Sequence, residues 1–564
     1  MITNLVDIPY INFPNPRFRR EKYQIIDGEA TISFFDNEND QLVRKSKILL
    51  PFSYETKKSG INIQKMYKHI EYDWDFTLSN IGTYLIHFGA VDYHCFVYIN
   101  DIFVGEHVGG FTAFSFDISS AIKVGKNHIR VIVYDSFCQE QLRGKQRSRD
   151  ESYECWYVQT TGIYKSVYIE RCGSTYVKKA LLNGDQNGNF TYQIDLNKKS
   201  NISIEIFDQG TLIKRITCDE NNNYCGTIHF DTYKLWSEKE PFLYDVKIVV
   251  DGKEKDEVMT YFAFRSITAS NGKLLLNNQS LFLKMVLNQG YYSQQGLTLT
   301  KADIIKDFAL MKEFGFNGCR IHQKIEDHLL YYLADVMGFY LWSELPSCYQ
   351  YSENSKKEIQ RDLQIIIDQN YNSPSILTYV IFNESWGIPE ISINKEVQEY
   401  VKDLTIWVKQ YDSTRLVVSN DGWNNIETTD IVSLHDYEQD AERLYDEYKD
   451  KNYVINGKII NKYGPAFVKN HVYKNQPIII SEFGGVALQC QDGWGYGDKA
   501  SDLEILKLRM QKLFDSVYHL DYLSGFCYCQ LSDVEQEING LVTSDRKNKL
   551  SIEVINDIVK GVKV

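Results

Sequence analysis

The chain has 564 residues, of which 43% are hydrophobic and 24% charged, and its formal net charge is −13. This length predicts several domains. The negative charge argues against nucleic acid as a partner, because it repels phosphate groups. No apolar run reaches the roughly 18 residues that a membrane span needs, and the first residues lack the basic start and apolar core of a secretory signal, so we expect a cytoplasmic protein. The 11 cysteines show no CxxC pair or metal-binding spacing, which indicates buried, reduced thiols.

The first part of the chain, residues 1–174, is rich in short strand-like runs. TYLIHFG, CFVYIN, HIRVIVYD and SVYIE alternate with turn residues such as Asn100-Asp101. Many short strands separated by turns predict a β-sandwich. Residues 175–267 continue the pattern with NFTYQIDL, ISIEIF, TIHF and YDVKIVV, and this stretch has the length of an immunoglobulin-like module.

In residues 268–564 the apolar residues recur at helical spacing. The apolar spacing predicts a helix over residues 301–314, with Thr300 as N-cap and Gly315 as its stop, and a second helix over residues 355–370. Short apolar runs alternate with helices of this kind: LKMVLNQ, NGCRIH, FYLWSE, ILTYVIFNE, RLVVSN, DIVSLHD, PIIISE and GFCYCQL. This alternation predicts a (β/α)8 TIM barrel.

Polar side chains occupy the carboxyl end of each predicted barrel strand. They are Gln289, His322, Glu344, Glu384, Asn420, His435 with Asp436, Glu482 and, on the last strand, Gln530. Because a TIM barrel carries its active site at these ends, apolar strands with polar ends are typical of a catalytic rim.

Two of these acids, Glu384 and Glu482, follow the fourth and seventh strands, which face each other across the mouth of a closed eight-stranded barrel. Two facing carboxyl groups suit glycoside hydrolysis, in which one donates a proton and the other attacks the anomeric carbon. Neighbouring groups can give two chemically identical acids different pKa values. The alternative for a single glutamate at a strand end is a structural cap or a pair with arginine, but two at these positions favour catalysis.

Several longer motifs match one family. Asn383-Glu384 ends the fourth strand and SEFG ends the seventh, and FNGCRIH and LADVMGFYLWSELP lie earlier in the same region. HFGAVDYHCFVYIN, GEHVGGFTAFSFDIS, LWSEKEPFLYDV and FAFRSI lie in the first two regions. With these motifs the chain resembles glycoside hydrolase family 2 over essentially its full length. The resemblance implies a jelly-roll sugar-binding domain (residues 1–174), an immunoglobulin-like β-sandwich (175–267) and a catalytic TIM barrel (268–564).

The resemblance also implies roles in a retaining mechanism. Glu384 would be the general acid and then the base, and Glu482 would be the nucleophile. Asn383 would hold the sugar 2-hydroxyl, and Arg320 would keep Glu482 ionised. Sugar-binding or supporting positions are implied for His322, Glu344, Trp386, His435, Tyr437, Trp494 and Gln530. The alternative for each of them is a structural role in the barrel.

The resemblance leaves the sugar open. Glucuronidases of the family carry an Asn-x-Lys motif that binds the sugar carboxylate, whereas this chain has Glu537-Ile538-Asn539 there, and Trp156 stands where they use an aspartate. We therefore expect an exo-acting β-galactosidase-like enzyme, with β-glucuronidase, α-L-arabinosidase and β-mannosidase as alternatives. The alternative of another class is a carbohydrate-binding protein without turnover.

No cofactor is expected. The magnesium-dependent β-galactosidases of the family have a histidine two residues after the glutamate that ends strand three. Here Glu344 is followed by Leu345-Pro346, so a divalent cation near Glu344 is not supported. The expected partner is an oligosaccharide or glycoside, and the resemblance implies a homo-oligomer.

Overall fold

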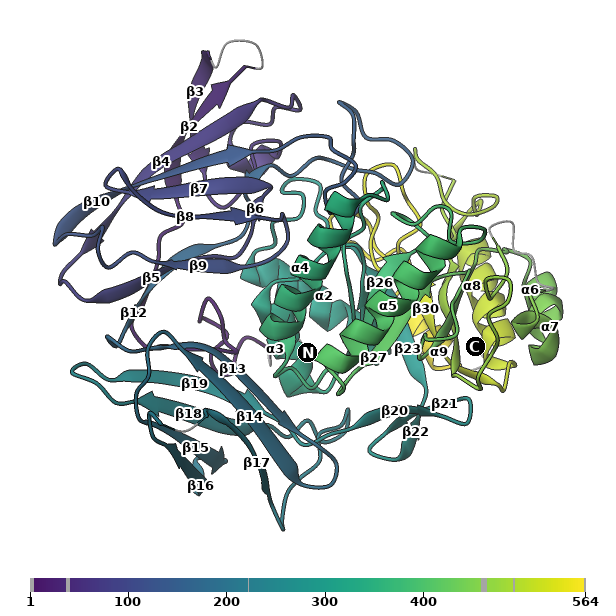
Figure 1. Cartoon of the computed structure of the whole chain (residues 1–564). Helices are drawn as coiled ribbons and strands as arrows, with labels where there is room; N and C mark the ends of the chain where they lie inside the picture. Colours follow the sequence, from purple (N-terminus) through teal and green to yellow (C-terminus); the bar gives the residue numbers. More distant parts are fainter. Residues whose placement is uncertain (1–4, 37–40, 222, 458–463, 490–491, 562–564) are drawn as a thin grey trace.

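The computed structural model describes residues 5–36, 41–221, 223–457, 464–489 and 492–561. Two β-sandwiches lie one below the other on one side of the molecule, and a barrel with its helices lies on the other side (Figure 1). No helix in the described residues is long and apolar enough to cross a membrane. The two sandwiches and the barrel correspond to the three predicted architectures.

The first sandwich pairs a six-stranded sheet with a four-stranded sheet. The first sheet has the order β3 (Leu42–Leu49), β2 (Glu29–Phe35), β4 (His69–Leu78), β10 (Gly125–Tyr134), β7 (His94–Ile99) and β8 (Ile102–Val108). The second has the order β1 (Tyr23–Ile25), β12 (Val167–Cys172), β5 (Thr83–Phe88) and β9 (Phe114–Asp117). Along β4, Ile70, Tyr72, Trp74 and Phe76 are buried at every second position, the alternation that one core-facing side of a strand requires.

The second sandwich is the immunoglobulin-like one. Its three-stranded sheet has the order β13 (Val177–Gly184), β14 (Asn189–Leu196) and β17 (Cys225–His229). Its four-stranded sheet has the order β16 (Thr211–Cys218), β15 (Ile202–Asp208), β18 (Tyr244–Val250) and β19 (Asp256–Phe262). Ile204, Ile206, Val246 and Ile248 are fully buried between the sheets.

The barrel contains eight parallel strands in consecutive order. They are β23 (Leu283–Asn288), β24 (Gly318–Ile321), β25 (Tyr340–Glu344), β26 (Ile376–Asn383), β27 (Leu416–Asp421), β28 (Val432–Asp436), β29 (Ile478–Gly484) and β30 (Leu523–Cys529). Between β27 and β28 the ring is joined by bonds from the Asp430 amide to the Val417 carbonyl (2.8 Å) and from the His435 amide to the Gly422 carbonyl (3.1 Å). A small sheet of β20 (Ile267–Ser270), β21 (Lys273–Leu276) and β22 (Gln279–Leu281) precedes it, and its Leu274 and Leu276 join the core inside the barrel.

Helices surround the barrel strands. They are α2 (Lys301–Glu313), α3 (His328–Met337), α4 (Glu353–Asn370), α5 (Lys395–Tyr411), α6 (Ala441–Tyr448), α7 (Lys451–Ile455), α8 (Leu503–Tyr518) and α9 (Ile552–Lys560). The prediction for α2 is confirmed, because Thr300 and Asp303 form a reciprocal capping box at its start. Helix α4 begins two residues before the predicted start, since Ser352 caps it through the amide of Ser355.

Contacts between domains fix the jelly-roll domain on its neighbours. The buried Arg20 guanidinium donates to Asp256 of the second sandwich (2.9 Å) and to Glu170 of the first (3.0 Å). Lys165 Nζ donates to the Ile325 carbonyl of the barrel (2.8 Å). The jelly-roll domain is thereby held beside the carboxyl ends of the barrel strands.

Candidate active site

Strand β26 ends in the turn that presents Glu384. Every residue from Ile376 to Asn383 is buried, but Glu384 and Ser385 adopt left-handed backbone angles, with φ of 50° and 64°. This conformation is costly away from glycine and is typical of functional sites. The Glu384 amide donates to the Asp421 carbonyl at 2.8 Å, which ties the turn to β27. The turn leaves the Glu384 side chain 19% exposed at the end of a buried strand.

Arg320, on β24, is the centre of the charge network. Its Nε donates to Glu344 (2.7 Å), and its two terminal nitrogens donate to Glu482 and Asn383 (2.7 Å each). It also forms an ion pair with Asp421 at 2.5 Å. Burial alone would lower the pKa of this fully buried guanidinium, but the three surrounding carboxylates hold that pKa well above its ordinary value. A permanent cation therefore lies under the site.

Glu482, at the end of β29, is held in the ionised form. Burial raises the pKa of its carboxyl group, but the positive charges of His435 and Arg320 outweigh burial and lower the pKa to about 2. The Tyr437 hydroxyl donates to the other oxygen of the carboxylate. A buried carboxylate that stays charged at neutral pH is suited to nucleophilic attack.

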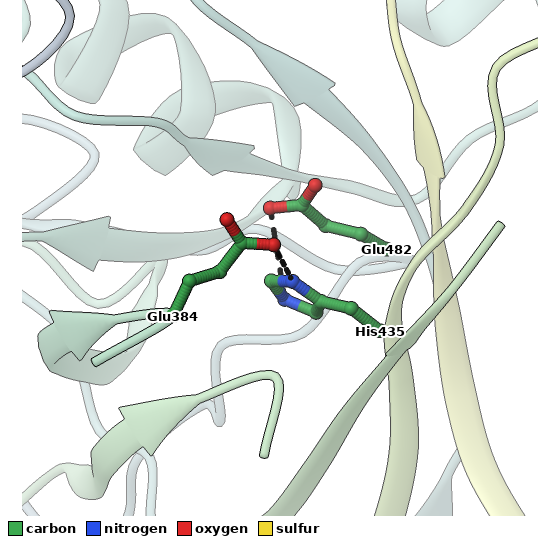
Figure 2. Close-up of side chains that lie close together, drawn as sticks. All are labelled: Glu384, His435 and Glu482. Atoms are coloured by element: carbon green, nitrogen blue, oxygen red, sulfur yellow. Dashed lines mark hydrogen bonds and ion pairs between the residues drawn. The ribbon is translucent and has the colours of Figure 1, made fainter. Parts of the chain in front are cut away.

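His435 lies between the two glutamates (Figure 2). Its Nδ1 is 2.9 Å from a carboxylate oxygen of Glu384, and its Nε2 is 2.9 Å from Asp421 and 3.6 Å from Glu482. Burial disfavours the charged imidazole, but Glu482 and Asp421 raise its pKa to about 10. The protonated ring therefore donates to Glu384 and Asp421, and its positive charge lies beside Glu482.

The same three side chains are the candidate for a metal site in the described residues. One ligand atom each from Glu384, His435 and Glu482 lies within 4.8 Å of the others. However, both ring nitrogens of His435 are engaged, and Arg320 lies 2.7 Å from Glu482 and would repel a cation. The chemistry of this set fits an ion-pair network better than a metal.

The carboxylate of Glu344 is also enclosed by donors. It accepts from Arg320 and Gln323, and His322 Nδ1 lies at 3.3 Å. Burial would raise the pKa of Glu344, and the charges of Arg320 and His322 lower it. The lack of a cation at this residue stays a prediction.

A cavity of about 300 Å³ opens above the network. Side chains of the barrel and of the jelly-roll domain line it: Lys145, Glu154, Cys155, Leu287, Gln289, His322, Asn383, Glu384, Trp386, Tyr437, Glu482, Trp494, Tyr496, Cys529 and Glu537. This volume lies at the lower end of the range for ligand pockets, about 300–1,000 Å³.

The residues singled out from the sequence gather at this cavity. Those that line it are Asn383, Glu384, His322, Trp386, Tyr437, Glu482 and Trp494. Those that lie behind its lining are Arg320, Glu344, His435 and Gln530, the last bonded to Gln289 at 2.7 Å. The proximity is shown by the structure, and the individual roles stay predictions.

Trp156 lies next to the cavity, and its alignment with the glucuronidase aspartate stays a prediction. Its ring packs against Trp386, with centroids 5.8 Å apart, while its neighbours Glu154 and Cys155 line the cavity. The Trp494 indole donates to the Glu154 carbonyl at 3.0 Å and so links the barrel rim to the jelly-roll domain.

Sequence reasoning missed two residues of consequence. Asp421 contacts both Arg320 and His435, and its only signal was its place directly after Asn420 at a strand end. Lys145 comes from the jelly-roll domain and carried no local signal. Its position depends on how that domain docks on the barrel.

Comparison with known proteins decides the family. The model "Glycosyl hydrolases family 2, TIM barrel domain" matches residues 267–564, "Glycosyl hydrolases family 2" matches 167–265, and the sugar-binding domain model matches 43–172. The chain belongs to glycosyl hydrolases family 2. The resemblance drawn from the motifs is thereby confirmed.

Relatives within family 2 carry different names. A putative β-glucuronidase of Formosa agariphila is 25% identical over 386 residues, which cover 64% of this chain and 46% of that protein. A β-galactosidase of Leuconostoc mesenteroides is 24% identical over 378 residues, which cover 61% of this chain and 34% of that protein. The chain thus spans less than half the length of these two curated relatives.

Solved structures share the fold of this family 2 chain. The crystal structure of a family 2 β-galacturonidase from Eisenbergiella tayi bound to galacturonate superposes with a TM-score of 0.77 at 18% identity. The alignment covers 97% of this chain and 98% of that one. At this identity the likeness concerns the fold alone.

Proposed function

We propose that this family 2 chain is a retaining β-glycosidase, with Glu384 as acid/base and Glu482 as nucleophile. The observation that carries the proposal is the geometry of the two acids. Their carboxylates approach within 4.8 Å, oxygen to oxygen, and retaining glycosidases hold the two carboxyl groups about 5–5.5 Å apart. An inverting enzyme needs a wider gap, about 6.5–9.5 Å, to admit the attacking water.

The different environments of the two acids support this assignment of roles. Glu482 is buried against Arg320 and His435 and stays ionised, whereas Glu384 is part-exposed toward the cavity. In the first step a Glu482 oxygen forms a bond to the anomeric carbon while the glycosidic C–O bond breaks and the Glu384 proton passes to the leaving oxygen. In the second step Glu384 takes a proton from water, whose oxygen replaces Glu482 on the sugar.

Asn383 is placed to hold the substrate. Its side-chain oxygen accepts from Arg320 at 2.7 Å, so the amide orientation is fixed, and its buried Nδ2 has no hydrogen-bond acceptor in the described residues. A free donor on the cavity wall next to Glu384 suits a bond to the sugar 2-hydroxyl. The small cavity holds a single sugar ring, which supports exo-acting cleavage.

The first candidate for the sugar is a β-galactoside. The acidic Glu537 lines the cavity, where the glucuronidases of the family carry an amide. A β-glucuronide or related uronide is the second candidate, supported by relatives named β-glucuronidase; for such a substrate Lys145, in the same cavity, would be the group that meets the sugar carboxylate.

The test is the initial rate with aryl β-galactoside, β-glucuronide, β-mannoside, β-glucoside and α-L-arabinoside. The anomer first released from the preferred substrate is identified by NMR, and a 2-deoxy-2-fluoro glycoside is used to trap the intermediate. We expect a β-anomeric product from the preferred β-glycoside and a mass increase on the peptide that contains Glu482. Release of the α-anomer, or labelling of another residue, would overturn the mechanism. Binding of sugars without turnover of any substrate would instead support a carbohydrate-binding protein.

A further inference from the structure

A segment of the jelly-roll domain delivers Lys145 to the barrel cavity. The amides of Arg143 and Gly144 both donate to the Ser347 carbonyl of the barrel, at 2.9 and 3.0 Å. The approach is close because position 144 is glycine. Its φ is +56°, and a Cβ there would lie 2.1 Å from the Gln323 carbonyl oxygen. Lys145 is therefore held at the cavity by backbone contacts on both sides of the domain boundary.

The ammonium group of Lys145 has no acceptor among the described residues. No hydrogen bond or ion pair joins its Nζ to any residue that the structure describes, and its polar head lies 5.5 Å from the ring centre of Trp386 and 5.9 Å from that of Tyr157. Burial would lower the pKa of the amine, but nearby Cys155 and Glu537 raise it, so the group is a cation. Three N–H donors therefore remain for a ligand.

Glu537 offers the complementary acceptor on the same cavity. Its side chain is buried, with 2% of its surface exposed. One oxygen accepts from the Tyr157 hydroxyl and the other from Asn539 Nδ2 at 3.1 Å. Each carboxylate oxygen has a second lone pair, so the carboxylate has capacity to accept bonds from a ligand that lies beside it.

We propose that Lys145 and Glu537 together bind hydroxyl groups of a neutral sugar and select against a uronic acid. A hydroxyl group can accept from the ammonium and donate to the carboxylate, whereas an ionised sugar carboxylate can only accept. The uronate would also enter a cavity already lined by Glu482 and Glu537, and like charges in a desolvated site repel strongly. The inference rests on the retaining glycosidase function and names its substrate class.

The test compares ligands that differ only at C6: aryl β-galactoside with β-galacturonide, and aryl β-glucoside with β-glucuronide. Binding of the four free sugars to Glu482→Gln is measured by calorimetry alongside turnover by the wild type. We expect kcat/KM at least about 100-fold higher for the neutral member of the preferred pair, and tighter binding of the neutral sugar. A preference for the uronide in either measurement would overturn the inference while leaving the glycosidase function intact.

Two variants show whether this pair of residues is responsible. Glu537→Gln supplies an amide donor in place of the anion, so the neutral-to-uronide ratio should fall at least about tenfold. Lys145→Met should lower kcat/KM for the neutral sugar about 10- to 100-fold, and Lys47→Met, at an exposed site of the same domain, controls for loss of a lysine. Loss of uronide turnover alone in Lys145→Met would show that the lysine binds a carboxylate and would overturn the inference.

Failure of the glycosidase function and failure of the neutral-sugar selectivity give different results. If no wild-type substrate is turned over and the fluoro glycoside labels nothing, the glycosidase function fails. The calorimetric comparison of neutral and acidic sugars still decides the inference. If calorimetry detects no binding of a neutral sugar, that result counts against the proposed selection of neutral sugars.

Discussion

The floor and the wall of the cavity are built in different ways. The floor consists of Arg320, Asp421, His435 and Glu482, which come from the ends of barrel strands and share buried ion pairs. The wall is the jelly-roll segment 143–157, which reaches the cavity through a few backbone bonds to the barrel. In the floor each charge depends on its neighbours, whereas Lys145 in the wall is left for a ligand. The barrel therefore fixes the charged groups at the base of the cavity, and the neighbouring domain adds a side chain to its wall.

The largest expected effect is in the floor. Glu482→Gln keeps the shape of the side chain but removes the proposed nucleophile, so kcat should fall by about 10⁵-fold or more. The rate is measured with the preferred aryl glycoside, and the melting temperature serves as the control for folding. Activity within tenfold of wild type in a folded variant would remove Glu482 from the mechanism.

A second change in the floor tests whether one cation holds the acids together. Arg320→Met leaves Glu344, Asp421 and Glu482 buried without their shared counter-ion, and we expect a loss of about 3–5 kcal/mol in stability. Arg320→Lys is the matched control, because it keeps the charge but cannot reach three carboxylates at once. Thermal unfolding should rank wild type above lysine and lysine above methionine. Equal melting of both variants would contradict the charge argument.

The imidazolium of His435 contacts Glu384 and Asp421 and lies 3.6 Å from Glu482. The positive charge of His435 contributes most to lowering the pKa of Glu482 from 4.5 to about 2, so His435→Gln should raise that pKa. Because the proposed nucleophile would act only when ionised, the acidic limb of kcat/KM should move to higher pH. The pH–rate profile measures this shift. An unchanged acidic limb, with a lower rate at every pH, would indicate that His435 only positions Glu384.

The same residue makes stability depend on pH. The folded protein raises the pKa of His435 from 6.5 to about 10, so its contribution is complete below pH 6.5 and is lost as the pH rises through 10. The melting temperature of the wild type should therefore fall more between pH 6.5 and 10 than that of His435→Gln. Parallel pH curves for the two proteins would show that this proton is not linked to folding.

The floor could be predicted from the sequence because its signals are local. Apolar strands of regular length end in polar residues such as Arg320-Ile321-His322 and Asn383-Glu384, and barrel geometry brings such ends together. Asp421 was not predicted as a site residue because β27 extends one residue beyond the expected strand end at Asn420. The left-handed turn at Glu384 also had no signal, since its conformation is imposed by bonds to Asp421 and Asn420 on the next strand.

The wall could not be predicted because its residues meet the cavity only through contacts with residues that are far away in the sequence. Lys145 is one lysine in a polar loop, and most of the residues that line the cavity with it belong to the barrel. Nothing in the spacing of jelly-roll strands fixes how two domains dock. The same holds for Glu537, whose acidity the sequence did show, but whose bond to Tyr157 across the domain boundary it did not.

The smallest expected effect tests that docking directly. In Gly144→Ala the new Cβ would lie 2.1 Å from the Gln323 oxygen, so the segment must move and Lys145 must move with it. KM for the preferred sugar should rise about tenfold while kcat changes about threefold or less, because the floor is untouched. Gly125→Ala is the matched control. Gly125 also has a positive φ, of +91°, but a Cβ there would meet nothing within 4 Å. This variant therefore adds only the free-energy cost of a left-handed backbone angle at a residue other than glycine. Because the two variants share the strained angle and differ in the contact, an equal rise in KM for both would mean that the close approach at Gly144 does not place Lys145. A rise confined to Gly144→Ala would tie sugar binding to the fit between two domains.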